Sequence, residues 1–175
     1  ISASAGRTSD GAINNNWSDW RWQFRNRIRT IDKLNEALRG ESGRPGDCRK
    51  VTRIYPLAAT PYYLSLIQPS DPNDPIRRQC FPDIKELTYS TGGVADPLEE
   101  DRHMEVPGLI HRCPDRCLVI MTNICATYCR HCNRKRIWKT KSCIKDKAYA
   151  QRIIDCIASR TSIREVILSG GDPFT

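Results

Sequence analysis

The sequence lacks any long apolar run. Its longest uninterrupted apolar stretches are only a few residues, such as residues 118–121, whereas a bilayer-spanning helix needs about 20. We therefore expect no membrane-spanning segment. An initial Met is also missing, and the chain ends at Thr175 directly after a Gly-Gly-Asp-Pro turn, so we expect a partial chain.

The sequence also lacks an even count of cysteines, which a fully paired set of disulfides would need. The chain has 9 cysteines among 175 residues, unevenly spaced, which argues against a secreted disulfide scaffold and favours reduced thiols with a metal role. A hydrophobic content of 39% is enough for a core and excludes disorder as the default. The 28 basic and 20 acidic residues give a net charge of +8, which is compatible with nucleic acid or with anionic ligands.

The amino-terminal part is predicted to be helical. Residues 1–16 are small and polar and indicate a flexible tail. Apolar residues three and four apart predict one helix from Trp17 to about Leu38, capped by Asn16 and with its aromatic stripe in the core. We expect residues 41–53 to form a connector.

Eight prolines between residues 56 and 107 predict short helices separated by turns, and no regular sheet. One such helix is expected over residues 62–67, after Pro61 at a first-turn position. We take residues 17–108 together as a helical amino-terminal region.

Residues 109–175 have the pattern of a βαβ unit. Buried strands are predicted at residues 118–121 and 164–168, with a helix at residues 144–159 between them. The two strands should be parallel neighbours. Ligands gather at the carboxyl ends of such strands, where a cysteine-rich loop (122–136) and a Ser-Gly-Gly-Asp-Pro turn (169–173) follow.

Cys125, Cys129 and Cys132 form a C-x3-C-x2-C triplet in the first of these loops. Three thiolates can hold three irons of a [4Fe-4S] cluster and leave the fourth iron open to another ligand. Two alternatives remain open from the spacing alone: a structural zinc completed by His131 or another cysteine, and simple burial of the thiols.

Further short motifs accompany the triplet in chain order. The chain contains CATYCRHC from Cys125, WSDWRWQFRNRI from Trp17, TPYYLSLI from Thr60, DPNDPIR from Asp71, DPLEE from Asp96, VPGLIHR from Val106, PDR from Pro114 and LSGGD from Leu168. This series, over about Trp17 to Asp172, resembles the lysine 2,3-aminomutase family of the radical S-adenosylmethionine (radical SAM) superfamily.

The resemblance implies a fold and an activity. The fold is α/β, with the helical region followed by the first βαβ units of an incomplete, TIM-like radical SAM barrel. The activity is that of an isomerase converting L-lysine to L-β-lysine. It uses a [4Fe-4S] cluster and S-adenosyl-L-methionine to generate a 5′-deoxyadenosyl radical, together with pyridoxal 5′-phosphate (PLP). The implied partners are a small amino acid, an electron donor such as flavodoxin or ferredoxin, and further copies of the full-length chain. Neither nucleic acid nor membrane is expected. The compartment is the cytoplasm, or an organelle matrix if the amino terminus is a transit remnant.

The resemblance also assigns site residues. It implies Cys125, Cys129 and Cys132 for the cluster; His131, Ser169, Gly170, Gly171 and Asp172 for S-adenosylmethionine; Arg134 for the substrate carboxylate; and Arg112 and Arg116 for the PLP phosphate. The family's PLP lysine is expected beyond Thr175, so no catalytic residue is assigned here and this piece alone is expected to be inactive. The remaining cysteines, at positions 48, 80, 113, 117, 143 and 156, receive no role.

Other functions remain open. Within the same chemistry, the substrate could be glutamate or a lysine on a translation factor. From a different class, the chain could be a zinc-stabilised basic module that binds nucleic acid through Arg130, Arg134, Lys135 and Arg136, with a steep salt dependence. We also expect an open sheet edge to make the isolated piece poorly stable.

Overall fold

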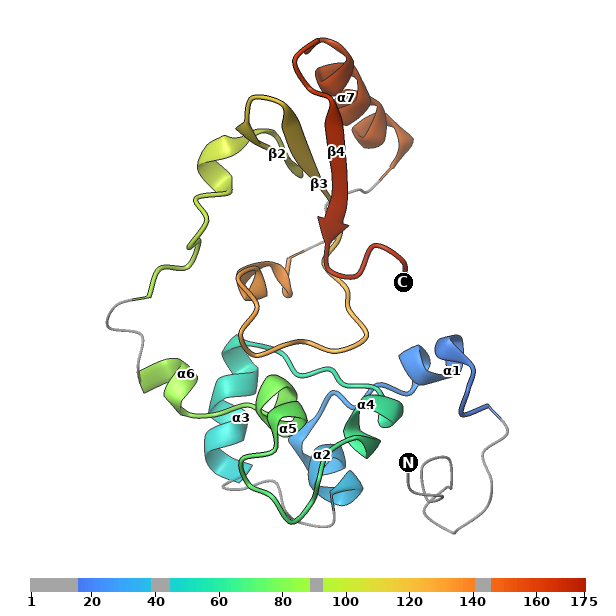
Figure 1. The fold of residues 1–175 in the computed structure, drawn as a ribbon. Helices are drawn as coiled ribbons and strands as arrows, with labels where there is room; N and C mark the ends of the chain where they lie inside the picture. Colours follow the sequence, from blue (N-terminus) through green and yellow to red (C-terminus); the bar gives the residue numbers. More distant parts are fainter. Residues whose placement is uncertain (1–15, 39–44, 89–92, 141–145) are drawn as a thin grey trace. The chain divides into compact units, whose positions relative to one another are not determined.

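A computed structural model describes residues 16–38, 45–88, 93–140 and 146–175 (Figure 1). The chain divides into two compact units, one of residues 1–89 and 126–132 and the other of residues 90–125 and 133–175. The predicted tail lies outside the described residues except for Asn16. Each unit is described by itself.

The first unit begins with two short helices, so the prediction of a single helix over residues 17–38 is wrong. Helix α1 covers Trp20–Arg25 and α2 covers Ile31–Ala37. Between them, Ile28 forms an antiparallel bridge with Ala59, with N–O distances of 2.7 and 3.1 Å. This pairing takes residue 28 out of the helical region. The residue that caps the start of α1 also differs from the prediction.

The caps are short polar side chains next to each helix start. The Asp19 carboxylate accepts a hydrogen bond from the Arg21 amide at 2.8 Å, in place of the predicted cap at Asn16. The hydroxyl oxygen of Thr30 accepts from the Lys33 amide and starts α2. Both residues satisfy amides that a helix start leaves without partners.

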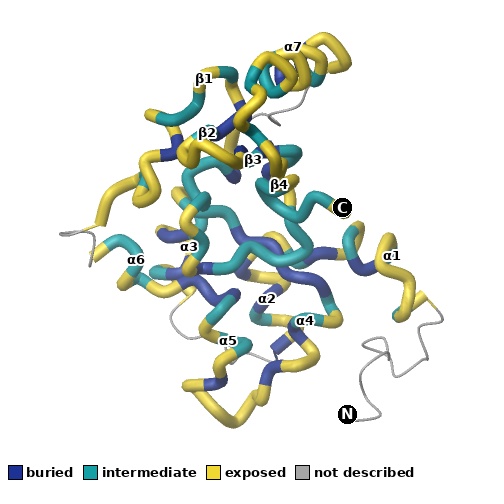
Figure 2. The backbone as a smooth tube through the Cα atoms, turned by 45° about the horizontal axis from the view of Figure 1, so that its top comes forward, coloured by how far each residue is buried: buried dark blue, intermediate teal, exposed yellow. Residues whose placement is uncertain are grey.

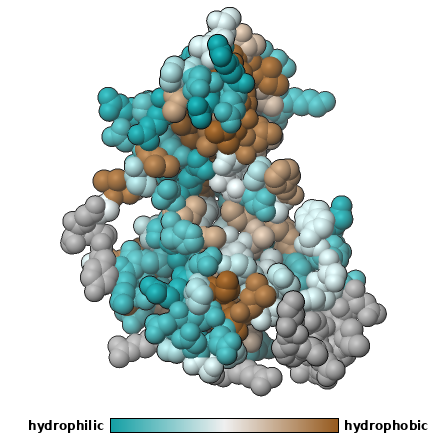
Figure 3. Space-filling model, in the orientation of Figure 1, coloured by the Kyte–Doolittle hydropathy of each residue, from teal (hydrophilic) through white to brown (hydrophobic). Residues whose placement is uncertain are grey.

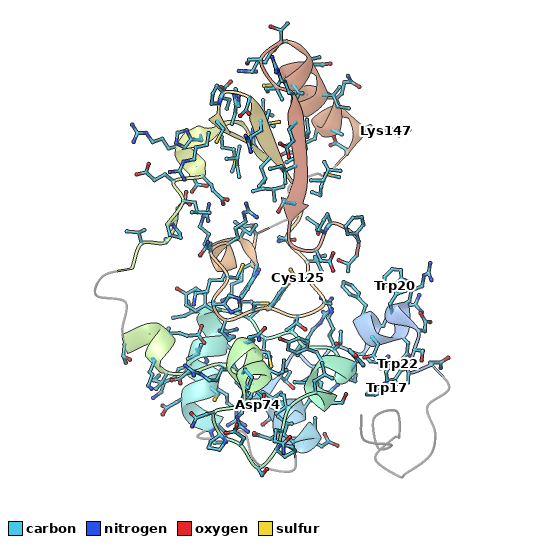
Figure 4. The ribbon with its side chains drawn as sticks, viewed as in Figure 1. Trp17, Trp20, Trp22, Asp74, Cys125 and Lys147 are labelled. Carbon is cyan, nitrogen blue, oxygen red and sulfur yellow. The ribbon has the colours of Figure 1, made fainter. Side chains whose placement is uncertain are left out.

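The aromatic stripe is only partly in the core. Trp20 is 52% exposed, and the guanidinium carbon of Arg21 lies over its ring, 4.7 Å from the ring centroid. The ring centroids of Trp17 and Trp22 lie 6.2 Å apart (Figure 4). Splitting the predicted helix changes which side chains share a face. The prediction that the whole aromatic stripe packs in the core is therefore wrong for Trp20.

Four more helices complete the first unit: α3 (Pro45–Ile54), α4 (Pro61–Ser65), α5 (Pro75–Cys80) and α6 (Lys85–Thr88). Helix α3 contradicts the predicted connector. Its proline at the first position is compatible with a helix start, and Cys48 and Val51 face the core three residues apart. The short helices after residue 56 are confirmed.

One apolar cluster holds the helices of this unit together. It is made of Ile31, Leu34, Leu38, Cys48, Leu57, Ala59, Leu64, Ile67, Cys80 and Phe81. Figure 2 shows the corresponding dark-blue segments in α2, α3 and the connections between helices. These members come from four helices and from the connections that follow them. Helices this short are not stable in isolation, so this packing stabilises them.

The second unit is built on a four-stranded sheet in the order β1-β2-β3-β4. Its elements are the 3-10 helix η2 (Asp101–His103), β1 (Met104–Val106), β2 (Leu109–Cys113), β3 (Arg116–Thr122), the 3-10 helix η3 (Lys135–Ile137), α7 (Lys147–Ala158) and β4 (Glu165–Gly170). Strands β3 and β4 pair in parallel, which confirms the predicted βαβ unit. The open sheet with helices confirms a mixed α/β fold.

Strands β1 and β2 are antiparallel additions that the sequence did not predict. They turn at Pro107 and Gly108, where Gly108 has a φ of 84°, a left-handed conformation that glycine adopts without strain. The expectation of no sheet before residue 108 is therefore wrong for β1. A strand of three residues is too short to leave a periodic signal.

Helix α7 covers one face of this sheet. Leu109, Cys117 and Val119 pack with Tyr149 and Ile153 of the helix in one buried cluster. Strand β4 lies at the edge, and Val166, Ile167 and Leu168 are 42%, 39% and 58% exposed, so its predicted burial is wrong within this chain. Figure 3 shows hydrophobic surface where β4 runs. Among the described residues, no helix is long and apolar enough to cross a membrane.

Candidate functional site

The carboxyl ends of β3 and β4 meet at one edge of the sheet. The Gly171 amide donates a hydrogen bond to the Thr122 carbonyl at 2.5 Å, and the Asp172 amide donates to the Ile124 carbonyl at 2.8 Å. The Gly-Gly-Asp turn is thereby tied to the residues that directly precede Cys125 (Figure 4). The parallel pairing thus brings the first predicted cluster ligand and the turn together, as the βαβ pattern predicted.

This close approach requires glycine. Gly170 has a φ of 121°, and a Cβ atom there would lie 3.0 Å from Cγ2 of Ile120 and closer still to the Thr122 carbonyl oxygen. At Gly171, a Cβ atom would lie 2.7 Å from both the backbone N and C of Ile124. The turn therefore presents backbone, with the carboxylate of Asp172, which suits a ligand carrying an amino group.

The cysteine triplet is divided between the two units. Cys125 belongs to the sheet unit, and Cys129 and Cys132 belong to the helical unit. All three thiols are half-buried. Among the described residues, no three His, Cys, Asp or Glu side chains are arranged as a ready metal site.

Cys129 and Cys132 are close in the helical unit. The Cys132 amide donates to the Cys129 carbonyl at 2.9 Å. Burial raises the pKa of the Cys129 thiol, and the neighbouring Cys132 raises it further. A cationic iron centre would oppose both effects, since thiolates are the metal-binding form. The residue types of this pair, rather than the pKa, fit a cluster, since iron–sulfur clusters are held by cysteine thiolates.

Arg134 lies in an ion-pair network of the sheet unit. Its guanidinium contacts Glu100 at 2.7 Å and donates to the Ser169 hydroxyl oxygen at 3.1 Å. Arg136 contacts the same carboxylate at 3.1 Å, and Asp96 at 3.1 Å. The network links the segment around Glu100 to the end of β4, and so joins two predicted ligand-binding residues, Arg134 and Ser169.

Glu100 is a site residue that the sequence analysis missed. Its side chain is 5% exposed, and its two oxygens pair with the two guanidinium groups, while Asp96 also contacts Arg136. The preceding Glu99 has a φ of 51°, and the Asp101 amide donates to the Asp96 carboxylate at 2.8 Å, so a tight turn aims these carboxylates. The motif DPLEE was the available signal, but nothing in it indicated a partner for Arg134.

Arg112 and Arg116, two of the remaining predicted residues, lie apart from the turn in the sheet unit. Both are exposed. They lie at the other end of the sheet, since β3 separates Arg116 from Thr122 by about 20 Å. Arg116 hydrogen-bonds to Asp115 at 2.9 Å, which lowers the pKa of that carboxyl. His131 is exposed within the cysteine loop. These three assignments stay predictions.

The other cysteines of the described residues differ in environment. Burial raises the pKa of Cys80 to about 12, with a further contribution from Cys129, so Cys80 stays a thiol at neutral pH. Cys48 is buried and donates to the Pro82 carbonyl at 3.4 Å, and Cys113 is exposed. Cys143 lies outside the described residues.

Comparisons with known proteins show which family the chain resembles. A family described as a 4Fe-4S single cluster domain matches residues 111–175. The chain is 44% identical to an L-lysine 2,3-aminomutase of Clostridium subterminale, over 89% of this chain and 38% of that protein. The resemblance to the lysine 2,3-aminomutase family is therefore confirmed.

Two further relatives of this family show the range of the similarity. An L-lysine 2,3-aminomutase of Bacillus subtilis is 38% identical over 89% of this chain and 33% of its own length. A glutamate 2,3-aminomutase of Clostridioides difficile is 36% identical over 91% of this chain and 37% of its own. The chain thus spans 33 to 38% of the length of these relatives. The predicted cofactors are supported at the level of the family.

Proposed function

We propose that the protein is a radical SAM, PLP-dependent amino-acid 2,3-aminomutase that converts L-lysine to L-β-lysine. The observation that carries this proposal is the 44% identity to an L-lysine 2,3-aminomutase along 89% of the chain. The meeting of the Gly-Gly-Asp turn with the start of the cysteine loop supports it independently.

The residues of this chain would bind and orient the cofactors. Cys125, Cys129 and Cys132 would hold three irons of a [4Fe-4S] cluster. When bound, that cluster would pass one electron from an external donor to S-adenosyl-L-methionine, whose cleavage gives methionine and a 5′-deoxyadenosyl radical, and PLP would carry the migrating amino group. The carboxylate of Asp172 would accept hydrogen bonds from the amino group of S-adenosyl-L-methionine, Ser169, Gly170 and Gly171 would contact its methionine end, and His131 would contact its adenine.

Three arginines would bind anionic groups. Arg134 would pair with the substrate carboxylate while Glu100 fixes the direction of its guanidinium fork. Arg112 and Arg116 would pair with the PLP phosphate. PLP itself would be attached to a lysine of the whole protein, and no residue of this chain is assigned to that role.

We extend the proposal to the architecture and the partners. The sheet is the start of a TIM-like barrel, preceded by a helical region over residues 17–108. The exposed apolar side chains of β4 support this, since an edge strand of a parallel sheet is normally covered or paired. The proposal also includes an electron donor such as flavodoxin or ferredoxin. It further includes assembly with other copies of the chain and a cytoplasmic location.

The cluster ligands are tested by anaerobic reconstitution with iron and sulfide. The wild-type protein should become brown, with about four irons per chain. Cys129→Ala should lose this chromophore, whereas Cys113→Ala, an exposed cysteine outside the triplet, should keep it. A colourless protein that binds one zinc ion would overturn the proposal.

The substrate is tested on the whole protein with labelled amino acids. We expect label from L-lysine in the β-amino acid product, and no turnover of L-glutamate. The reverse preference would assign the glutamate reaction, which one relative's name carries. Turnover of a lysine only within a translation factor would assign the protein-directed reaction.

The nucleic-acid alternative has little structural support. Three of the four basic residues it needs are paired with carboxylates: Arg130 with Glu86, and Arg134 and Arg136 with Glu100. Phosphate binding would have to break these ion pairs. Retention on a heparin column that disappears at moderate salt, without iron in the protein, would favour that alternative.

A further inference from the structure

Arg130 is a buried cation inside the cysteine triplet. It lies between Cys129 and Cys132 in the chain, and its side chain is 5% exposed. Nε and Nη2 donate to the two carboxylate oxygens of Glu86, both at 2.9 Å. This is a two-pronged arginine–carboxylate pair, which fixes orientation as well as charge.

The same guanidinium also caps the end of a helix. Nη1 donates to the Pro56 carbonyl at 2.9 Å, and Nη2 to the Tyr55 carbonyl at 3.3 Å. These carbonyls directly follow α3, whose last turn continues in the hydrogen bond from the Tyr55 amide to the Val51 carbonyl. A cation is favoured at this negative end of a helix.

The Glu86 carboxylate, which pairs with Arg130, is also held by a second hydrogen bond. Its Oε1 atom accepts a hydrogen bond from the Asp83 amide at 3.1 Å, and the Asp83 carboxylate accepts from the Lys85 amide at 2.9 Å. This reciprocal pattern is that of a capping box at a helix start. The start of α6 therefore orients the carboxylate that receives the guanidinium.

The backbone of the loop is fixed on the same unit. The Arg130 amide donates to the Gln79 carbonyl at 2.7 Å, and the Tyr128 amide donates to the Ala58 carbonyl at 2.8 Å. Residues 126–132 consequently cluster with the helical unit, while the residues on either side of them belong to the sheet unit. Three segments of the helical unit, residues 55–58, α5 and α6, thus position one short loop.

We propose that Arg130 is a positioning residue for the cluster thiolates of Cys129 and Cys132, acting through Glu86 and the carbonyls of Tyr55 and Pro56. The proposal rests on the proposed function, since it assigns the source of order in the cluster loop. A buried ion pair adds little stability compared with apolar side chains of similar size. Fixed geometry beside two ligands is the better explanation for it.

The experiment compares three changes in the full chain. Arg130→Lys keeps the charge but loses the planar fork. Glu86→Gln keeps the shape but loses the carboxylate charge. The double variant Arg130→Met with Glu86→Met replaces the pair by apolar side chains, which should preserve folding while removing the anchor. Arg49→Gln, which breaks an exposed ion pair with Asp32 in the same unit, is the control.

The first measurement needs no cluster. Anaerobic apo-protein is alkylated with iodoacetamide, and the rates at Cys129 and Cys132 are read by peptide mass spectrometry relative to Cys125. We expect the relative rates to rise about 10-fold or more in all three variants, because the loop loses its anchor, and to stay unchanged in Arg49→Gln. Unchanged rates in the double variant, with a circular dichroism spectrum like the wild type, would overturn the proposal.

The second measurement uses the reconstituted protein. We expect transfer of iron to a chelator to be about 10- to 100-fold faster in the variants than in the wild type, and the electron paramagnetic resonance signal of the reduced cluster to broaden. Wild-type rates in the double variant would show a purely structural role and refute the proposal. If the wild type itself binds no iron, the proposed function fails, while the alkylation rates still decide whether Arg130 positions the loop.

Discussion

Replacing Gly171 by alanine tests whether the turn after β4 touches the end of β3. The new Cβ atom would lie 2.7 Å from the backbone N and C of Ile124, well inside the 3.5 to 4.0 Å of an ordinary carbon contact. Backbone atoms cannot rotate away as a side chain can. The turn must therefore move, and its hydrogen bonds to Thr122 and Ile124 must lengthen or break.

The magnitude follows from those two hydrogen bonds. Each contributes about 0.5 to 1.5 kcal/mol net, so losing both lowers the local opening free energy by about 1 to 3 kcal/mol. The same range is typical of overpacking in a filled site. Gly46→Ala is the matched control, because nothing lies within 4 Å of its Cβ position and alanine is favoured in helix α3.

Native-state hydrogen exchange measures this opening directly. The amides of Gly171 and Asp172 should exchange about 5- to 150-fold faster in Gly171→Ala, after correction for intrinsic rates, and at wild-type rates in Gly46→Ala. If the turn binds S-adenosyl-L-methionine, its affinity should fall in the first variant alone. Wild-type exchange at both amides in Gly171→Ala would refute the close approach.

Three other changes have defined outcomes. Glu100→Gln should destabilise the protein by about 3 to 5 kcal/mol in urea unfolding, since it removes the buried carboxylate that pairs with both Arg134 and Arg136 and leaves Arg136 with Asp96 and Asp101; a loss below about 1 kcal/mol would contradict the network. Burial by itself raises the pKa of Asp74, but backbone amides that donate to it outweigh this, and the net pKa is below its usual value. Its stabilisation is therefore complete above about pH 4 and is lost as the pH falls through the lower folded value. The melting temperature of the wild type should fall toward that of Asp74→Asn on acidification, and a widening gap would contradict the shift. Tyr149→Phe should cost about 1 to 2 kcal/mol, because the Pro107 carbonyl loses its hydroxyl donor, and an unchanged urea midpoint would contradict that contact.

Local patterns predicted the βαβ unit well. The apolar run ending at Met121 and the run ending at Leu168 are strands, and the amphipathic segment between them is a helix. Period and length are properties of a short window of residues, so they can be found without the fold. Because parallel strands end at the same edge of a sheet, the turn glycines lie beside the start of the cysteine loop.

Long-range pairing decided what the sequence analysis missed. The bridge between Ile28 and Ala59 splits the predicted first helix, and burial of Cys48 and Val51 makes a helix where charge and glycine had indicated a connector. In both places, packing against distant residues outweighed local preference. The exposure of Trp20 follows from the same split.

The sequence by itself carried the pattern behind the proposed chemistry: three cysteines in a C-x3-C-x2-C triplet, a Gly-Gly-Asp turn after a strand, and an ordered set of motifs that resembles the lysine 2,3-aminomutase family. Only the tertiary structure decided how those residues are held. Glu86 lies 44 positions before Arg130, and Glu100 lies 34 before Arg134, yet each carboxylate contacts its guanidinium. No local pattern specifies such a partner, because ion pairs form between side chains that folding brings together.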